Sequence, residues 1–263
     1  MGGLLLRIIA VGALGFPSLG KSALPMFQSL ETSPPQTAPS VIAWQKDFVP
    51  VPAGTYRLGS REGETDAAPR EVTLKSFRLA RHEVTVAEYA AYLNDQPPGR
   101  RPVSPDLEIE DGRWVPRRGM ARRPAAWVTP AEAAAYAVWL SAKTGVRVRL
   151  PTEDEWEAAA RGGVVGARYP WGWGAPEGRA CFSAASARVV GSYDPNPLGL
   201  YDMAGNVFEW CADTNGAAAP VNARGGSWAE RDPKFLRVFH RTPFRRDYRG
   251  ADVGFRVLVE AGD

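Results

Sequence analysis

Three stretches of the chain carry the pattern of polar and apolar positions that begins a short helix. Each starts with a threonine followed three residues later by a glutamate, at Thr85–Glu88, Thr129–Glu132 and Thr152–Glu155. The threonine hydroxyl can accept a hydrogen bond from an N–H group that the first turn leaves unpaired, and the glutamate can reach back to the threonine N–H. Each pair therefore predicts a helix start.

The second of these helices has the clearest limits. Pro130 follows the threonine, at a position where the missing N–H group costs nothing. Gly145 marks the expected end, because glycine readily adopts the left-handed conformation that closes a helix. The third helix is expected to end at Gly162-Gly163. The buried stripe of the second helix is expected at Ala133, Tyr136, Ala137 and Leu140.

After Gly163 the helical spacing stops and the chain becomes rich in glycine, proline and aromatic residues. Asp111-Gly112, in the Pro- and Arg-rich segment between the first two helices, predicts a small hairpin. Irregular backbone in a compact domain has to satisfy its polar groups through specific turns or bound ions. The pattern therefore predicts an α+β domain with three short helices and little regular secondary structure. Short strands are expected at 188–192, 236–240 and 255–259.

The first residues carry an apolar run typical of an export signal. Arg7 precedes the apolar stretch Ile8–Phe16, and Pro17 ends it. A bilayer span needs about 20 apolar residues, so this run is too short to cross a membrane. We therefore expect an exported protein, periplasmic or extracellular, with no membrane span after signal removal. The expected organisation is a signal peptide over 1–20, a flexible Pro-rich linker over 21–45 and one folded domain over 46–260.

Charge and composition exclude several classes of protein. The net charge of +3 over 263 residues is small, and the chain has no zinc-finger or Walker pattern, which argues against a nucleic-acid binder. His82 and His240 are the only histidines, so a metal site built from three histidines of one chain is excluded. We expect a monomer that acts on a small-molecule or peptide substrate and binds no nucleic acid.

The stretch Gly199–Trp210 places acidic residues among large apolar ones. Asp202 and Glu209 cannot be buried without partners, since an unpaired buried carboxylate costs several kcal/mol. Gly205 suggests a tight, left-handed backbone position. Two interpretations fit these residues. The carboxylates either bind a hard cation such as calcium together with backbone carbonyls, or they pair with arginines and cap backbone N–H groups in a core loop.

Seven motifs in order along the chain resemble those of the formylglycine-generating-enzyme family, also called sulfatase-modifying-factor domains. They are Phe48–Ser60, Glu83–Tyr89, Arg149–Glu157, Tyr169–Gly172, Gly199–Trp210, Arg224–Trp228 and Gly254–Arg256. Each motif alone is modest, and their common order is specific. The resemblance runs from about residue 48 to 258 and implies a C-type-lectin-like fold of the formylglycine-generating-enzyme type.

The resemblance also implies a structural calcium ion. Its ligands would be the side chains of Asp202 and Glu209 and the backbone oxygens of Gly205 and Val207. A second calcium site of the family would fall near residues 180–190, where this chain lacks the expected amide and acidic ligands. We expect the first site and not the second.

The copper chemistry of the family is not expected in this chain. Family members that make formylglycine use two cysteines after Arg-Gly-Gly-Ser-aromatic, and those thiolates bind copper(I), a soft ion that prefers sulfur. Here Arg224–Trp228 is intact, but Glu230 and Phe235 occupy the two cysteine positions. A carboxylate and a phenyl ring cannot form a dithiolate copper site.

Glu230 is the first candidate for a different chemistry. A carboxylate in a pocket lined by Trp228 and Phe208 can have a raised pKa and act as a general base, beside Ser227. His240 is a candidate for a second titrating group. The alternative is that Glu230 pairs with an arginine, Arg231 or Arg237, and that the histidine is structural.

Two further questions stay open from the sequence. Cys181 and Cys211 could form a disulfide that closes a loop of about 30 residues, or remain two separate buried thiols. The arginines of the C-terminal region could frame an anionic ligand, or pair with nearby carboxylates in a surface network.

Two classes of function remain. The family resembled includes exported members without the copper cysteines that oxidise the pyoverdine chromophore precursor during siderophore maturation. This chain is therefore expected to be a non-copper oxidoreductase or maturation enzyme acting on a secreted or periplasmic substrate. The alternative is a non-catalytic C-type-lectin-like binding or assembly module, because the fold alone does not decide the function.

Overall fold

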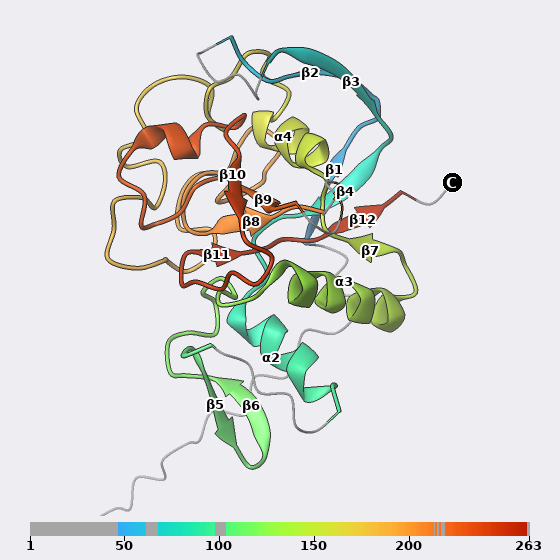
Figure 1. The fold of residues 1–263 in the computed structure, drawn as a ribbon, viewed down its shortest axis with the longest axis vertical. Helices are drawn as coiled ribbons and strands as arrows, with labels where there is room; N and C mark the ends of the chain where they lie inside the picture. The colour runs from blue at the N-terminus through green and yellow to red at the C-terminus, as the bar shows by residue number, and fades with distance from the viewer. Residues whose placement is uncertain are drawn as a thin grey trace, which may run out of the picture. The chain divides into compact units, whose positions relative to one another are not determined.

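All three predicted helix starts open helices in the computed structural model (Figure 1). The structure describes residues 47–61, 68–97, 104–212, 214, 216 and 219–261, all within one compact unit, Ala38–Asp263. The predicted signal peptide and linker lie outside the described residues. The helices are α2 (Val86–Asn94), α3 (Pro130–Thr144) and α4 (Glu153–Arg161).

The capping predictions are confirmed in detail. Each threonine hydroxyl accepts a hydrogen bond from the glutamate N–H three residues on, and each glutamate carboxylate accepts one from the threonine N–H. Helix α3 ends at Gly145 and α4 at Gly162, both left-handed with φ of 71° and 60°. At Gly162 a Cβ atom would come within 2.7 Å of Pro197 Cδ, so only glycine fits. No helix in the described part of the chain is long and apolar enough to span a bilayer.

Two four-stranded sheets form the centre of the domain. The first has the order β1-β4-β12-β7, in which every neighbouring pair is antiparallel. The second has the order β10-β9-β8-β11, with β8 and β11 parallel. The first sheet consists of β1 (Phe48–Val51), β4 (Phe77–Ala80), β7 (Val148–Arg149) and β12 (Leu258–Glu260). The second consists of β8 (Phe208–Trp210), β9 (Val221–Arg224), β10 (Thr242–Phe244) and β11 (Val253–Gly254).

Two hairpins extend from the sheets. One pairs β2 (Gly54–Leu58) with β3 (Arg70–Leu74), and the other pairs β5 (Leu107–Glu110) with β6 (Arg113–Pro116). The second is the predicted Asp-Gly hairpin. Asp111 and Gly112 both have positive φ, 47° and 74°, as a two-residue primed turn requires. Figure 1 shows this hairpin next to α2, which in turn lies beside α3.

The strand predictions were less successful. Residues 188–192 form no strand, because the N–H groups of Arg188 and Gly191 bond to side chains of the Gly199–Trp210 stretch instead of to a neighbouring strand. The expected strand at 236–240 is replaced by a 3-10 turn, Pro233–Leu236, followed by irregular chain. The third candidate, 255–259, overlaps β12 at its C-terminal end.

Aromatic side chains fill the core between the helices and the sheets. Tyr136 of α3 packs edge-on against Phe255, with ring centroids 5.3 Å apart, and Tyr89 of α2 contacts both rings. Trp156 of α4 is fully buried in a second cluster with Leu79 of β4. Each such side chain contributes roughly 1.5–3 kcal/mol by leaving water, which fixes α4 against the sheets.

Candidate functional site

The Gly199–Trp210 stretch crosses the domain as a series of left-handed turns. Asp202, Gly205 and Asn206 have positive φ, at 55°, 76° and 62°. A Cβ atom at Gly205 would come within 2.4 Å of the Cys181 carbonyl oxygen, which confirms the predicted tight position. The Asn206 side chain accepts a hydrogen bond from the Arg188 N–H and donates one to Glu83 Oε1 at 2.9 Å. These contacts hold the stretch beside residues 83 and 188.

Glu209 is buried and paired with Arg256. Its Oε1 accepts from Arg256 Nη2 at 2.6 Å, and its Oε2 accepts from Arg256 Nε at 2.7 Å and from Trp156 Nε1 at 2.6 Å. Both side chains are almost completely buried, at 1% and 0% exposure. A two-point charged pair of this kind is among the strongest hydrogen-bonded contacts in proteins. Glu209, in β8, therefore uses both oxygens to hold Arg256, which follows β11.

Glu83 and Asp202 are a second acidic pair, and Glu83 was missed in the sequence. Glu83 is 1% exposed, its Oε1 accepts from Asn206, and a hydrogen bond joins its carboxyl group to that of Asp202. Asp202 is 8% exposed and accepts from the Gly191 N–H at 2.6 Å. Burial, and then the charge of Asp202, raise the pKa of Glu83 well above its usual value, and burial raises the pKa of Asp202.

These residues fit a hard cation in part. Calcium takes carboxylate and carbonyl oxygens, and the adjacent carboxyl groups of Glu83 and Asp202 are donors of this kind. The charge of Glu209 also acts on both groups, and Arg256 supplies a positive charge. Both oxygens of Glu209 already accept hydrogen bonds from Arg256 and Trp156, so its part as a ligand stays a prediction. Within the described ranges, no three His, Cys, Asp or Glu side chains gather as a metal-binding group.

Glu83 could have been found from its position. It stands directly before the capping threonine Thr85, in a motif that we used only as a helix start. A carboxylate at that point enters the core with the first helix, where Val84 and Val86 are also buried. An acidic side chain between buried neighbours needs a partner.

A tight turn from Ser227 to Glu230 presents the second candidate group. The Glu230 N–H donates to the Ser227 carbonyl at 3.2 Å, and Ser227 Oγ accepts from the Ala229 N–H. Ser227 is completely buried. Gly226, with φ of 73°, packs so closely that a Cβ atom would come within 2.8 Å of Leu236. Ser227 therefore shapes the turn that projects Glu230.

The Glu230 carboxylate is half-buried and makes no hydrogen bond or ion pair within the part of the chain that the structure describes. The alternative in which it pairs with Arg231 or Arg237 is not what the structure contains. Burial, and then the charges of Asp252 and Asp232, raise the pKa of Glu230. Asp252 in turn accepts a hydrogen bond from the Tyr248 hydroxyl at 3.0 Å.

Tyr248 closes the acidic side of this site. Burial, followed by the charges of Asp252 and Glu230, raises the pKa of Tyr248 to about 12, so its hydroxyl remains a proton donor. Its ring stacks on Phe244, with centroids 4.7 Å apart. The Trp228 indole N–H donates to the Ala251 carbonyl at 3.0 Å. These contacts link the turn that carries Glu230 to the segment that carries Asp252.

The structure places His240 beside Phe235. The two rings meet edge-on with centroids 4.9 Å apart, and Phe235 lies edge-on to Phe208 at 6.4 Å. The backbone N–H of His240 donates to the Arg237 carbonyl. The catalytic role predicted for Ser227, Glu230 and His240 stays a prediction.

A family model described as "Sulfatase-modifying factor enzyme 1-like domain" matches residues 35–261. The chain belongs to this sulfatase-modifying factor family. It is 31% identical to the formylglycine-generating enzyme of Thermomonospora curvata, over 86% of this chain and 97% of that protein. The structure of PvdO from Pseudomonas aeruginosa superposes with a TM-score of 0.67 and 33% identity, covering 81% of this chain and 94% of that one.

A longer protein contains a related region. The serine/threonine-protein kinase pkn1 of Chlamydia pneumoniae is 41% identical over 179 residues, which are 65% of this chain and 28% of the kinase. The chain thus matches little more than a quarter of the length of that relative. The fold predicted from the motifs is confirmed, an α+β domain of the C-type-lectin-like, formylglycine-generating-enzyme type.

Within this sulfatase-modifying factor domain, Cys181 and Cys211 are free, buried thiols. Cys181 Sγ lies 3.7 Å from the Ser186 carbonyl oxygen, and Cys211 Sγ lies 3.9 Å from that of Glu209. Burial raises the pKa of both thiols, which keeps them protonated. Of the two alternatives left by the sequence, the structure contains the separate thiols.

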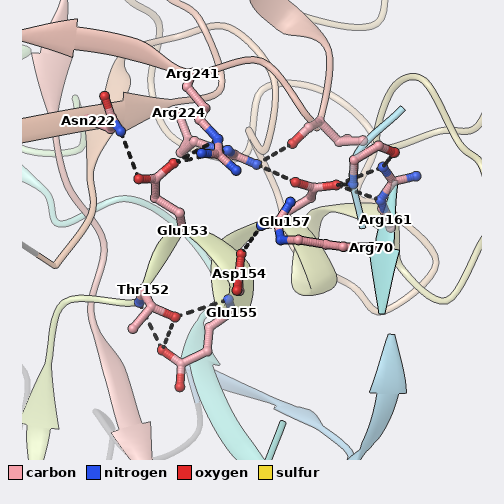
Figure 2. A network of polar contacts seen from close by, with 12 residues as sticks. Arg70, Thr152, Glu153, Asp154, Glu155, Glu157, Arg161, Asn222, Arg224 and Arg241 are labelled. Carbon is pink, nitrogen blue, oxygen red and sulfur yellow. Dashed lines mark hydrogen bonds and ion pairs between the residues drawn. The ribbon is translucent and has the colours of Figure 1, made fainter. Parts of the chain in front are cut away.

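The C-terminal arginines of the domain pair with carboxylates. Arg249 pairs with Glu132 at 3.0 Å, Arg245 with Asp247 at 2.9 Å and Arg241 with Glu153 at 3.2 Å. Arg224 of the Arg-Gly-Gly-Ser-Trp motif is completely buried and donates to Glu157 at 2.8 Å, as Figure 2 shows. Most of these arginines therefore pair with carboxylates, which is the second of the two alternatives that the sequence left open.

Proposed function

We propose that this chain is an exported, copper-independent oxidoreductase of the sulfatase-modifying factor family that matures a secreted or periplasmic substrate. One observation carries the proposal. The Glu230 carboxylate stands half-buried and unpaired, among the described residues, where copper-dependent members have a thiolate. A structural role would give this carboxylate a partner, whereas a general base has to be free to take a proton.

Glu230 acts as the base in this proposal. It removes a proton from the substrate, which then gives two electrons and a second proton to dioxygen. Glu230 returns its proton, and the products are the oxidised substrate and hydrogen peroxide. Asp252 and burial hold the pKa of Glu230 above its usual value, which strengthens it as a base. Trp228 ties the turn to Ala251, and Tyr248 donates a hydrogen bond to Asp252.

Copper does not enter this mechanism, because the donor set does not fit it. Phe235 has no donor atom, and its ring packs against Phe208 and His240. Glu230 offers hard oxygen atoms, and copper(I) prefers sulfur. Formylglycine generation from a sulfatase cysteine is therefore disfavoured as the activity of this chain.

Calcium has a structural part in the proposal. Glu83 and Asp202 would hold the ion with backbone oxygens of the Gly199–Trp210 stretch, such as those of Gly205 and Val207. The ion would supply the positive charge that the buried acidic pair lacks.

The test replaces Glu230 with Gln and measures substrate-dependent oxygen uptake, with the pyoverdine chromophore precursor as the first substrate. The Gln side chain keeps the shape and removes the base, so kcat/KM is expected to fall by about 100-fold or more. The matched control is Glu110→Gln, at an exposed carboxylate of β5 outside this site, which is expected to change the rate little. Full activity in the Glu230→Gln variant, at an unchanged melting temperature, would refute the proposal.

A binding or assembly module is the second candidate. It is favoured by the kinase pkn1 relative, in which the matched region makes up 28% of a longer protein. A module would co-purify with a partner, and the Glu230→Gln variant would bind that partner unchanged. The same variant therefore separates the two functions.

A further inference from the structure

A pocket of about 600 Å³ opens between β3, the start of α4 and the residue before β10. Arg70, Glu153, Asp154 and Arg241 line its polar side. Its lining shares no residue with the Glu230 turn or with the Glu83–Asp202 pair. This volume is in the range of small-molecule sites. Figure 2 shows Glu153 beside Arg241 and, as a separate contact, Asp154 beside Arg70, and these side chains come from three segments that are distant in the sequence.

The two arginines of the pocket have unused hydrogen-bond donors. Arg70 uses Nη2 for an ion pair with Asp154, and Arg241 places Nε 3.2 Å from Glu153 Oε2. Arg241 Nε is buried and makes no well-aligned hydrogen bond with the described residues. A guanidinium group has five N–H donors. Most of the donors of Arg70 and Arg241 therefore have no partner within the described part of the chain.

The acceptors of the pocket are largely occupied. Glu153 Oε1 already accepts a hydrogen bond from Asn222 Nδ2 at 2.8 Å, and the carboxylate pairs with Arg224 and Arg241. The connected network contains three arginines, Arg161, Arg224 and Arg241. It contains two carboxylates, Glu153 and Glu157. Arg70 with Asp154 and Arg149 with Glu155 form separate pairs. Among the described residues, the network therefore has one more positive charge than negative charges.

Part of the pocket lining is apolar. Ala68, Pro69 and Leu74 form it, and Leu74 packs against the cluster around Trp156. A strongly hydrated anion gains nothing from such a surface, whereas an anion that carries an apolar group buries that group there. The pocket therefore combines a guanidinium pair, one unmatched positive charge and a small apolar wall.

We propose that this pocket binds a small carboxylate ligand with an apolar substituent. Arg70 and Arg241 hold the carboxylate through their planar N–H groups, which match its two oxygens. The substituent lies on Pro69 and Leu74. The inference is independent of the activity proposed for Glu230.

The experiment titrates the full chain with N-acetyl-L-leucine by calorimetry, at fixed ionic strength. N-acetyl-L-leucinamide is the neutral control, because it has the same apolar body without the charge. We expect saturable binding of the acid, with the amide at least about tenfold weaker, since charged hydrogen bonds contribute that much. Equal binding of acid and amide, or no saturable binding of the acid, would overturn the proposal. Inorganic phosphate binding as tightly as the acid would overturn the assignment to a carboxylate.

Two variants locate the site. Arg241→Gln and Arg70→Gln are each expected to weaken binding of the acid about tenfold or more. Among the described residues, Arg70 pairs only with Asp154, and both side chains are half-exposed, so Arg70→Gln is expected to fold. This variant therefore still tests the site if Arg241→Gln does not fold. The matched control is Arg245→Gln, which removes the same charge from a side chain that is 84% exposed. Equal loss in all three variants would show general charge attraction and would contradict a built site.

Discussion

At the scale of single residues, the molecule separates buried carboxylates into paired and unpaired ones. Glu209 and Glu157 each bond to a buried arginine. Glu83 and Glu230 have raised pKa values, chiefly because they are buried and then because a neighbouring aspartate repels their charge. A paired carboxylate serves the fold, whereas an unpaired one is available to a proton or a cation.

The Glu209–Arg256 pair gives a stability prediction. Glu209→Gln keeps the side-chain volume but leaves the fully buried Arg256 charge without its anion. Removing one partner of a buried pair costs about 3 kcal/mol or more. We expect the free energy of unfolding, measured by urea denaturation, to fall by about that amount. The control Arg245→Gln, on an exposed pair, is expected to stay within about 0.5 kcal/mol. Similar small losses in both variants would contradict this ranking.

The Glu230 site gives a pH prediction. A base is active when deprotonated, so kcat/KM should rise with pH through a pKa above the ordinary glutamate value of 4.5. Asp252 raises this pKa by charge repulsion. Asp252→Asn removes the repulsion, so the acidic limb of the pH profile should move to lower pH. A limb that stays in place, measured over pH 4 to 8, would show that another group controls the rate.

At the scale of elements, the sequence predicted what is decided locally. The three helices were found because Thr85, Thr129 and Thr152 make capping bonds with residues only three positions away. The hairpin at Asp111-Gly112 was found for the same reason. Residues 188–192 were mistaken for a strand, because the N–H groups of Arg188 and Gly191 bond to the side chains of Asn206 and Asp202, which are distant in the sequence. Glu83 was missed for the same reason, since its neighbours Asp202 and Asn206 come from the far end of the chain.

The Gly199–Trp210 stretch gives a metal-removal prediction. If calcium binds at Glu83 and Asp202, a chelator such as EGTA should lower the melting temperature of the wild-type chain. Glu83→Gln removes a carboxylate ligand, so its melting temperature should not respond to the chelator. Glu260→Gln, at a half-exposed carboxylate of β12, is the control and should keep the wild-type response. Wild-type melting that is indifferent to chelator, with no calcium found by elemental analysis, would remove the ion from the proposal.

At the scale of the whole molecule, the two ends of the domain meet in one sheet. Strand β12, near the C-terminus, lies between β4 and β7, and β4 also pairs with β1. Leu258 of β12 is fully buried in the cluster around Trp156, and Val259 packs in the neighbouring cluster around Tyr136. Neither strand pairing nor this long-range burial has a local signature, so the order of the sheet could not be predicted from the spacing of apolar residues.

This closure predicts that the domain unfolds as one unit. Ending the chain at Val257 removes β12 and leaves β4 and β7 each without a partner strand along one edge. It also removes the buried Leu258, which alone is worth roughly 1.5–3 kcal/mol, against a total of about 5–15 kcal/mol for a domain. We expect the truncated chain to lose its cooperative thermal transition, measured by circular dichroism. The control ends after Glu260, retains β12 and should melt like the full chain. A cooperative transition in the shorter chain would show that the second sheet folds without the complete first sheet. The turn that carries Glu230, which follows β9, would then not depend on the pairing of β12.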